Sequence, residues 1–306
     1  MGSHTDRAHP GTDGTGDRAT PSRGGIDAFD SLLVRQPIRD GETAPVRDLI
    51  AAWARERDGD AGALLPVAGV HLVTLFLDRG AFGWHPDSPS GDALLWYVEV
   101  ADDDAPVWAD PDGAIRDASP LFSAGLADLL DGTARVHADG RDGHQLLTHA
   151  THPHRQDRYE THCGPAMVAP VAGEALPIPV AVTTLPLKPG AISWLTARVV
   201  RAGNWLKRFD RVAEWLRTKT ETLEEEAMYT ESLLLEPVGD RLVLHYYMEG
   251  EEMDRLYDAY EETDNWDARG SDWVMRRIFE DPGSFLDPPL ESDCEVLIHA
   301  VDPARP

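Results

Sequence analysis

Cysteine is scarce in this chain, which has only Cys163 and Cys294 among its 306 residues. Neither stands in a Cys-x-x-Cys motif. The sequence therefore gives no sign of a disulfide framework, or of a zinc or redox site built on paired cysteines.

Positive charge is scarce as well. Lys and Arg number 28 against 54 Asp and Glu, which gives a formal net charge of −26. Nucleic acids and anionic membranes are bound through basic surfaces, so this balance argues against both as partners. No apolar run approaches the roughly 20 residues that cross a bilayer, and no charged and then apolar leader opens the chain. We expect a cytoplasmic protein.

The motifs of several large enzyme classes are also missing. The sequence contains no Gly-rich dinucleotide loop, no P-loop and no Gly-x-Ser-x-Gly elbow. Residues 1–25 hold almost no apolar side chains, and we expect them to form a disordered tail. The whole chain, with 42% hydrophobic residues and nine Trp, is long enough for two domains with cores of their own.

What the chain does contain is a repeat of its own pattern. The segment LLWYVE at 94–99 matches LHYYME at 244–249, and LLTHA at 146–150 matches VLIHA at 296–300. Both pairs are offset by 150 residues, so that Glu99 corresponds to Glu249 and His149 to His299. Upstream, LFLD at 75–78 matches LLLE at 233–236. A repeat of this length indicates a duplicated domain rather than a solenoid.

Hydrophobic periodicity predicts the same order of elements in both halves. The first unit, 26–152, has predicted strands at 31–34, 70–78, 93–100 and 145–151, with helices from Pro45 and over 121–130. A Pro-rich linker, 153–192, contains an extended segment at 179–187. The second unit, 193–306, has predicted strands at 195–200, 229–236, 241–249 and 295–301, with helices at 205–216 and 253–279. The βαββαβ order predicts an α+β fold of two ferredoxin-like units that pack like a fused dimeric α/β barrel.

The second unit resembles a known family. The residues that carry the likeness are ETLEEE at 221–226 running into ESLLLE at 231–236, followed by LHYYME at 244–249. Over about residues 195–300 the chain is similar to short bacterial and archaeal proteins known only as a domain of unknown function. The resemblance implies a ferredoxin-like unit of the dimeric α/β-barrel type and brings no activity with it. The first half departs from the pattern, with Val73 at the position of Glu231 and an insertion at 79–91.

Candidate site residues gather on the strands of the second half. Because side chains two apart share a strand face, His245, Tyr247 and Glu249 lie together, and His299 points the same way from the last strand. We expect Glu231 on this face too. The alternating apolar residues fit the helix-covered face, so the polar face is predicted to line the barrel interior.

These residue types support more than one chemistry. The imidazoles of His245 and His299, with the carboxylates of Glu249 and Glu231, could ligate a divalent Fe, Zn or Cu ion. Alternatively, the same groups could transfer protons without a metal, with His as base. A haem held by His299 or His149 is a third possibility, from fold analogy alone. The plainest alternative is that these are interface residues and water-facing carboxylates at a sheet rim.

The two halves are not equivalent in this prediction. The first half offers Tyr97, Glu99 and His149, but it has Leu95 where the second half has His245. We therefore expect one working site, in the second half. The resulting hypothesis is a small-molecule enzyme of the α/β-barrel monooxygenase or cyclase kind, with His245, Glu249, His299 and Tyr247 as catalytic residues. The alternative is a non-catalytic module that binds a small ligand or a protein, and a homodimer is compatible with both.

Overall fold

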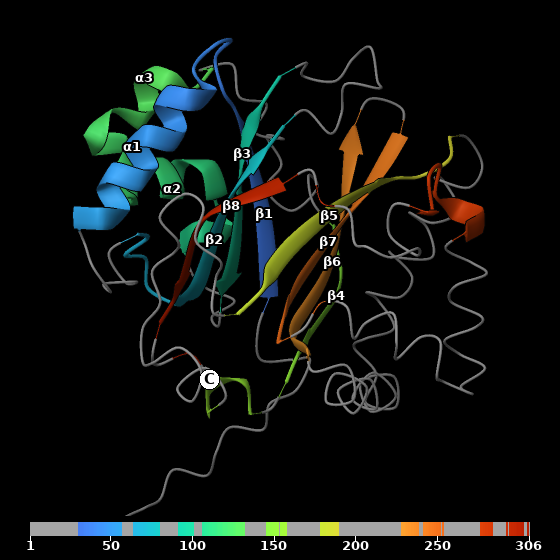
Figure 1. Cartoon of the computed structure of the whole chain (residues 1–306). Helices are drawn as coiled ribbons and strands as arrows, with labels where there is room; N and C mark the ends of the chain where they lie inside the picture. The colour runs from blue at the N-terminus through green and yellow to red at the C-terminus, as the bar shows by residue number, and fades with distance from the viewer. Residues whose placement is uncertain are drawn as a thin grey trace, which may run out of the picture.

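The computed structural model describes residues 30–56, 64–79, 91–100, 106–131, 145–152, 154–157, 178–189, 228–238, 241–251, 253, 276–283, 292, 294–302 and 305. They form an α+β fold built on two four-stranded antiparallel sheets (Figure 1). No helix in the described part of the chain is long and apolar enough to cross a membrane.

Each sheet has the same internal order of strands. The first runs β1-β3-β2-β8, which are Asp30–Pro37, Ala93–Val100, Val70–Asp78 and Cys294–Val301. The second runs β5-β7-β6-β4, which are Val180–Pro186, Arg241–Gly250, Met228–Val238 and Gln145–Thr151. Laid side by side, the two orders are the same, which confirms the fold class expected from the repeat.

The closing strand of each half lies in the sheet of the other half. Strand β8 ends the chain and pairs with β2 in the first sheet, while β4 ends the first half and pairs with β6 in the second sheet. Two ferredoxin-like units of the kind predicted from the sequence would each complete a sheet with their own closing strand. The difference has a simple reason: strand periodicity determines which face of a strand is apolar, but not which sheet edge the strand joins.

The extended segment expected inside the linker is β5, an edge strand of the second sheet that takes the place of β1 in the first sheet. In β5, Val182 pairs with Tyr247, as Leu33 in β1 pairs with Tyr97. The second sheet therefore includes residues that precede 193. The strand predicted at 195–200 and the helix predicted at 205–216 lie outside the described residues.

Helices cover the outer face of the first sheet (Figure 1). They are α1 (Thr43–Glu56), η2 (Pro106–Trp108), α2 (Pro111–Ala118), η3 (Phe122–Leu126) and α3 (Ala127–Leu129). In α1, Val46, Ile50 and Trp53 are buried at helical spacing against the sheet. The single helix predicted over 121–130 is interrupted at Gly125, whose φ of 110° suits glycine and lies outside the helical region.

The outer face of the second sheet is apolar as well. Its buried side chains include Leu235, Leu244, Tyr246 and Met248, with Phe279 packed on them from a short helical turn at 276–278. The rest of the helix predicted over 253–279 lies outside the described residues, apart from Met253.

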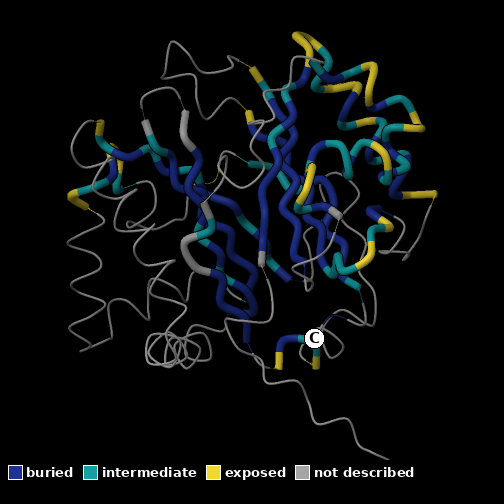
Figure 2. The backbone as a smooth tube through the Cα atoms, turned by 180° about the vertical axis from the view of Figure 1, so that it is seen from behind, coloured by how far each residue is buried: buried dark blue, intermediate teal, exposed yellow. Residues whose placement is uncertain are grey.

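The inner faces of the two sheets pack on each other and form a third core. It contains apolar side chains from both sheets, namely Leu33, Leu72, Phe76, Leu95, Tyr97, Ile178, Val180, Val182, Tyr229, Leu234, Tyr247 and Val301. The edge strand β1 approaches β4, and β8 approaches β5, so the eight strands enclose one interior in the manner of a barrel. Figure 2 shows the strands as the buried centre of the molecule.

Candidate functional site

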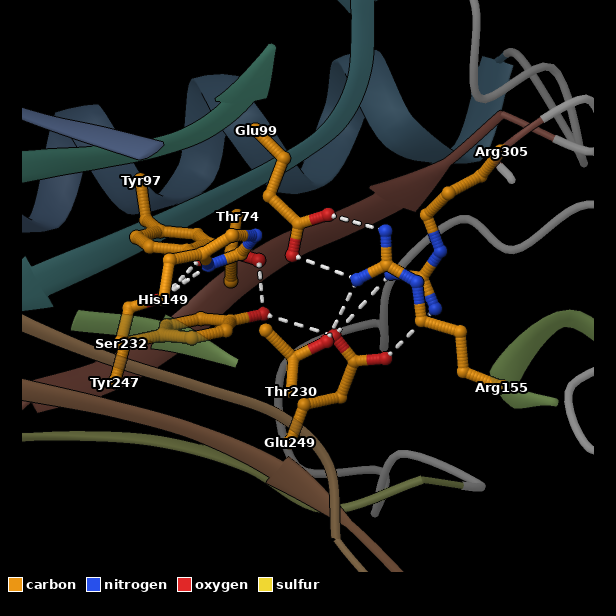
Figure 3. A network of polar contacts seen from close by, with 10 residues as sticks. All are labelled: Thr74, Tyr97, Glu99, His149, Arg155, Thr230, Ser232, Tyr247, Glu249 and Arg305. Atoms are coloured by element: carbon orange, nitrogen blue, oxygen red, sulfur yellow. Dashed lines mark hydrogen bonds and ion pairs between the residues drawn. The ribbon is translucent and has the colours of Figure 1, made fainter. Parts of the chain in front are cut away.

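Two stacked tyrosines mark the centre of this interior. The rings of Tyr97 and Tyr247, which are equivalent in the repeat, lie with centroids 3.5 Å apart and planes 9° from parallel. Both are fully buried. Tyr97 comes from β3 in the first sheet and Tyr247 from β7 in the second, so the stack joins the two sheets (Figure 3).

Each tyrosine hydroxyl leads through a second hydroxyl to a histidine on the opposite sheet. In relay 1, the hydroxyl of Tyr97 lies 2.7 Å from Ser232 Oγ, which lies 2.7 Å from His149 Nδ1. In relay 2, the hydroxyl of Tyr247 lies 3.2 Å from Thr74 Oγ1, which lies 2.9 Å from His299 Nδ1. The strand exchange makes this possible, because it places each histidine beside the hydroxyl residue of its relay.

Buried ion pairs adjoin the relays. Glu99 Oε2 lies 2.9 Å from Arg155 Nη2, and Glu249 Oε1 lies 3.0 Å from Arg305 Nη2. The two arginines are again 150 residues apart, and each follows a closing strand. Arg155 also donates to Thr230 Oγ1 at 2.9 Å. All four charged side chains are buried, and Figure 3 shows the carboxylates directed at the guanidinium groups.

The surroundings determine which of these groups are charged. Burial alone would raise the pKa of Glu249, but Arg305 and the other nearby groups hold it at about 2. Burial lowers the pKa values of His149 and His299 to about 4, against the opposing effect of the nearby carboxylates. Burial, with Glu99, raises the pKa of Tyr97 well above 10. At neutral pH the interior thus contains two neutral imidazoles, a neutral phenol at Tyr97 and balanced ion pairs.

The two relays differ in how they are anchored. The hydroxyl of Tyr247 also donates to Glu249 Oε2 at 3.2 Å, so relay 2 is tied to an ion pair. In relay 1, the Nε2 atom of His149 is buried and has no hydrogen-bond partner among the described residues. The two relays therefore differ in two contacts: the bond from Tyr247 to Glu249, and the missing partner of His149 Nε2 among the described residues.

The structure brings together some of the residues predicted from sequence. Tyr247, Glu249 and His299 belong to relay 2 and its ion pair, and the first-half residues Tyr97, Glu99 and His149 belong to relay 1.

His245 lies on the predicted face but has partners of its own. Its Nε2 atom is 2.7 Å from Glu236 Oε2, and its Nδ1 atom is 3.2 Å from Thr184 Oγ1. Nearby, Arg35 Nη1 pairs with Asp78 at 2.5 Å, and its Nε lies 3.8 Å from Glu236. His245 is therefore part of a second buried polar cluster.

Glu231 lies on the other side of its sheet. It accepts a hydrogen bond from the hydroxyl of Tyr246, which belongs to the outer core. Leu235, four residues further along β6, faces outward as well, as strand alternation requires. The inward face predicted for Glu231 was wrong, because its two neighbours on β6, Thr230 and Ser232, point inward.

The predicted metal ligands do not fit a metal centre. Among the described residues, no three or more His, Cys, Asp or Glu side chains are grouped to hold an ion. His245 bonds Glu236, and Glu231 faces the outer core. The four predicted ligands are therefore not grouped around one ion, and haem ligation by His149 or His299 stays a prediction.

Sequence reasoning missed Arg155, Arg305, Ser232 and Thr74. The repeat offset carried a signal for the arginines, since both lie six residues beyond the paired histidines. Ser232 and Thr74 also occupy equivalent positions on β6 and β2, at the offset that relates LLLE to LFLD. Short hydroxyl side chains within apolar strands give no such signal when each half is considered alone.

Comparisons with known proteins place no family name on the chain. No family model matches it, and no curated protein matches it. Among solved structures, a "putative monooxygenase" of Fusobacterium nucleatum is similar over 90% of this chain and 94% of its own, with 9% identity and a TM-score of 0.41. An anthrone oxidase-like protein covers 90% of this chain and 92% of its own, with 9% identity and a TM-score of 0.32. At these values neither likeness indicates what the chain does.

Proposed function

We propose that the chain is an enzyme of the α/β-barrel monooxygenase or cyclase kind, which removes a proton from a small organic molecule held between the two sheets. The observation that carries this proposal is the pair of buried, neutral imidazoles, each aligned by a hydroxyl that a tyrosine also contacts. A purely structural interior would be expected to avoid so many polar groups, because each must be satisfied at a cost.

The environment leaves both imidazoles neutral. Burial keeps both histidines unprotonated well below neutral pH, so each is available to accept a proton. The carboxylates of Glu99 and Glu249 would stabilise the imidazolium that forms, since each favours the protonated state of its neighbouring histidine. Apolar side chains of the interior core, such as Phe76 and Leu95, supply the surface that an organic substrate needs.

Removal of the proton leaves its electron pair on the substrate. In a monooxygenase, a carbanion or enolate formed in this way reacts with molecular oxygen: a CH2 group loses two hydrogens, one oxygen atom becomes its new carbonyl oxygen, and the other leaves as water. In a cyclase, the carbanion adds to a carbonyl group of the same molecule, and the new alkoxide takes up the proton. Both outcomes share the proton transfer that the described residues can perform, and they differ in the co-reactant.

A binding screen followed by product analysis tests the proposal. The full chain is screened by thermal shift against a panel of small aromatic and carbonyl compounds with weakly acidic C–H bonds. Compounds that stabilise it are incubated with the protein in air and under nitrogen, and the products are identified by mass spectrometry.

We expect turnover that the His149→Gln/His299→Gln double variant lacks. Oxygen incorporation only in air would indicate a monooxygenase, and a ring-closed isomer under both atmospheres would indicate a cyclase. Compounds that bind tightly and are recovered unchanged under both conditions would overturn the proposal in favour of a non-catalytic binding module.

A further inference from the structure

The two histidines of the interior are matched in sequence but not in their bonding. His149 is 3% exposed, its Nδ1 atom bonds Ser232, and its Nε2 atom has no hydrogen-bond partner among the described residues. A buried polar atom without a partner is uncommon in a folded protein and is a place where a ligand can complete the bonding. Relay 1 is the one that presents such an atom.

The state of this imidazole follows from the cost of leaving its atoms unpaired. If Nε2 carried the hydrogen, a buried N–H donor would have no acceptor, and such donors are rarer in native structures than under-used acceptors. With the hydrogen on Nδ1, His149 donates to Ser232 Oγ, and Nε2 presents a lone pair. The hydroxyl of Ser232 then donates its own hydrogen to the oxygen of Tyr97, 2.7 Å away, which fixes the orientation of Oγ.

Relay 2 is held more firmly. The hydroxyl of Tyr247 lies between Thr74 and the carboxylate of Glu249, and Glu249 is paired with Arg305 through both of its oxygens. Movement of a proton along this relay would disturb a buried ion pair, which is costly to break. Relay 2 therefore links the two sheets through bonds that hold each of its groups in place.

The charges of the interior limit what can bind. Glu99 is neutralised by Arg155, and Glu249 by Arg305, so the site has no spare charge of either sign within this network. A charged ligand would enter without a counter-ion and would bear the full cost of desolvation. A neutral molecule with one weakly acidic hydrogen would supply the donor that Nε2 lacks.

We propose that His149 is the catalytic base of the site, that its Nε2 atom takes the weakly acidic hydrogen of a neutral ligand, and that relay 2 is structural. This inference rests on the proposed function and reverses the expectation that the second half holds the working site. In the step itself the proton passes to Nε2 and its electron pair stays on the ligand. Ser232 and Tyr97 act as positioning residues, because they hold the ring with its Nδ1–H directed at Oγ.

The imidazole states can be measured without any substrate. Long-range proton–nitrogen spectra of the full chain labelled with ¹⁵N-histidine distinguish the two neutral forms of each ring. We expect the His149 signals to report hydrogen on Nδ1. We expect Ser232→Ala to shift the His149 signals and the matched Thr74→Ala variant to leave them unchanged. A spectrum with hydrogen on Nε2 of His149 would overturn the inference.

A second measurement uses para-nitrophenol as the probe, because it is neutral when protonated, weakly acidic and coloured when its proton is lost. We expect it to perturb the Nε2 signal of His149, and we expect His149→Gln to weaken its binding about tenfold, as loss of one buried hydrogen bond implies. His299→Gln, the matched control, should change the affinity less than about twofold, which lies within the usual scatter of such contributions. Equal losses in the two variants, or no binding to the unaltered chain, would contradict the inference.

The outcomes separate this inference from the proposed function. Turnover that depends on His299 and survives His149→Gln would overturn the assignment of the base and leave the enzyme proposal standing. A correct His149 state and probe binding, with no turnover of any compound, would support the inference about the site and count against the enzyme.

Discussion

At the scale of single residues, the buried ion pairs are the most demanding feature of the molecule. Glu249 and Arg305 are both completely buried, and each would be very costly to leave alone in an apolar interior. The net attraction between the two charges is a minor reason for their pairing. The main reason is that removal of one partner leaves the other charge buried without compensation. The same holds for Glu99 and Arg155.

Arg305→Ala should destabilise the fold strongly. We expect the free energy of unfolding to fall by about 3–5 kcal/mol, since the carboxylate of Glu249 remains buried without its partner. Urea denaturation at neutral pH measures the change. As a matched control, Arg79 pairs with Glu295 but has a side chain that is 54% exposed, and Arg79→Ala should cost less than about 1 kcal/mol.

The double variant Glu249→Leu/Arg305→Leu sharpens this test. It removes both charges together, so it should be clearly more stable than Arg305→Ala alone. If the double variant loses as much stability as the single one, the cost arises from lost packing and not from a stranded charge.

The site shows what residue patterns reveal and what they leave out. Tyr247, Glu249 and His299 could be predicted, because alternation on a strand and the repeat offset both act locally along the chain. The partners of His245 could not, since Glu236 comes from the neighbouring strand and Thr184 from a segment that reads as linker. Glu231 failed for a related reason: alternation groups residues into two faces but does not say which face is inside.

At the scale of elements, the exchanged strands decide how the interior is built. His149 on β4 bonds Ser232 on β6, and His299 on β8 bonds Thr74 on β2. In each case the histidine of one half meets a hydroxyl of the other half. Neither relay could form within a unit that kept its own closing strand. The bounds of β2, β3 and β4 could be predicted closely from hydrophobic periodicity. The exchange of β4 and β8 could not, because the local pattern of a strand does not determine which of two similar sheet edges it joins.

Fragments that correspond to the two halves should not fold as monomers. A fragment of residues 1–157 has β4 but lacks β6, its partner, and a fragment of residues 158–306 has β8 but lacks β2. Each would expose an unpaired sheet edge and the apolar inner face. We expect a mixture of the two to form a 1:1 complex with cooperative melting, while each alone is unfolded or self-associated. Sedimentation and circular dichroism measure both; a stable folded monomer of either fragment would contradict the strand exchange.

At the scale of the whole molecule, the two sheets form a symmetric frame whose two halves hold different side chains. Tyr97, Glu99, His149 and Arg155 recur at one offset as Tyr247, Glu249, His299 and Arg305, and the ion pairs recur with them. The two halves differ at two places. Leu95 occupies the position in the first half that His245 occupies in the second, and Tyr247 bonds the carboxylate of Glu249. In such a frame one half can support the fold while the other half carries the chemistry. The Nε2 atom of His149, which has no hydrogen-bond partner among the residues that the structure describes, is consistent with this arrangement.

The buried titratable groups together predict how stability depends on pH. His149 and His299 have pKa values of about 4 in the fold against 6.5 for the ordinary side chain, so the unfolded chain binds more protons between these values. Their contribution is fully present above pH 6.5 and is lost as the pH falls toward 4, by about 3 kcal/mol for each histidine. Glu249, with a pKa of about 2 against 4.5, acts in the same direction at lower pH, and its contribution is lost between 4.5 and 2.

Urea denaturation at a series of pH values from 7.5 to about 4 tests the sign and the origin of this dependence. We expect stability to fall steadily below pH 6.5 in the unaltered chain. The His149→Gln/His299→Gln double variant has no imidazole to titrate at these positions, so its stability should change much less between pH 6.5 and 4.5. A variant that keeps the full slope would show that histidines elsewhere in the chain cause it. Stability that rises on acidification would mean that the imidazoles are charged in the fold, which is incompatible with His149 as a neutral base.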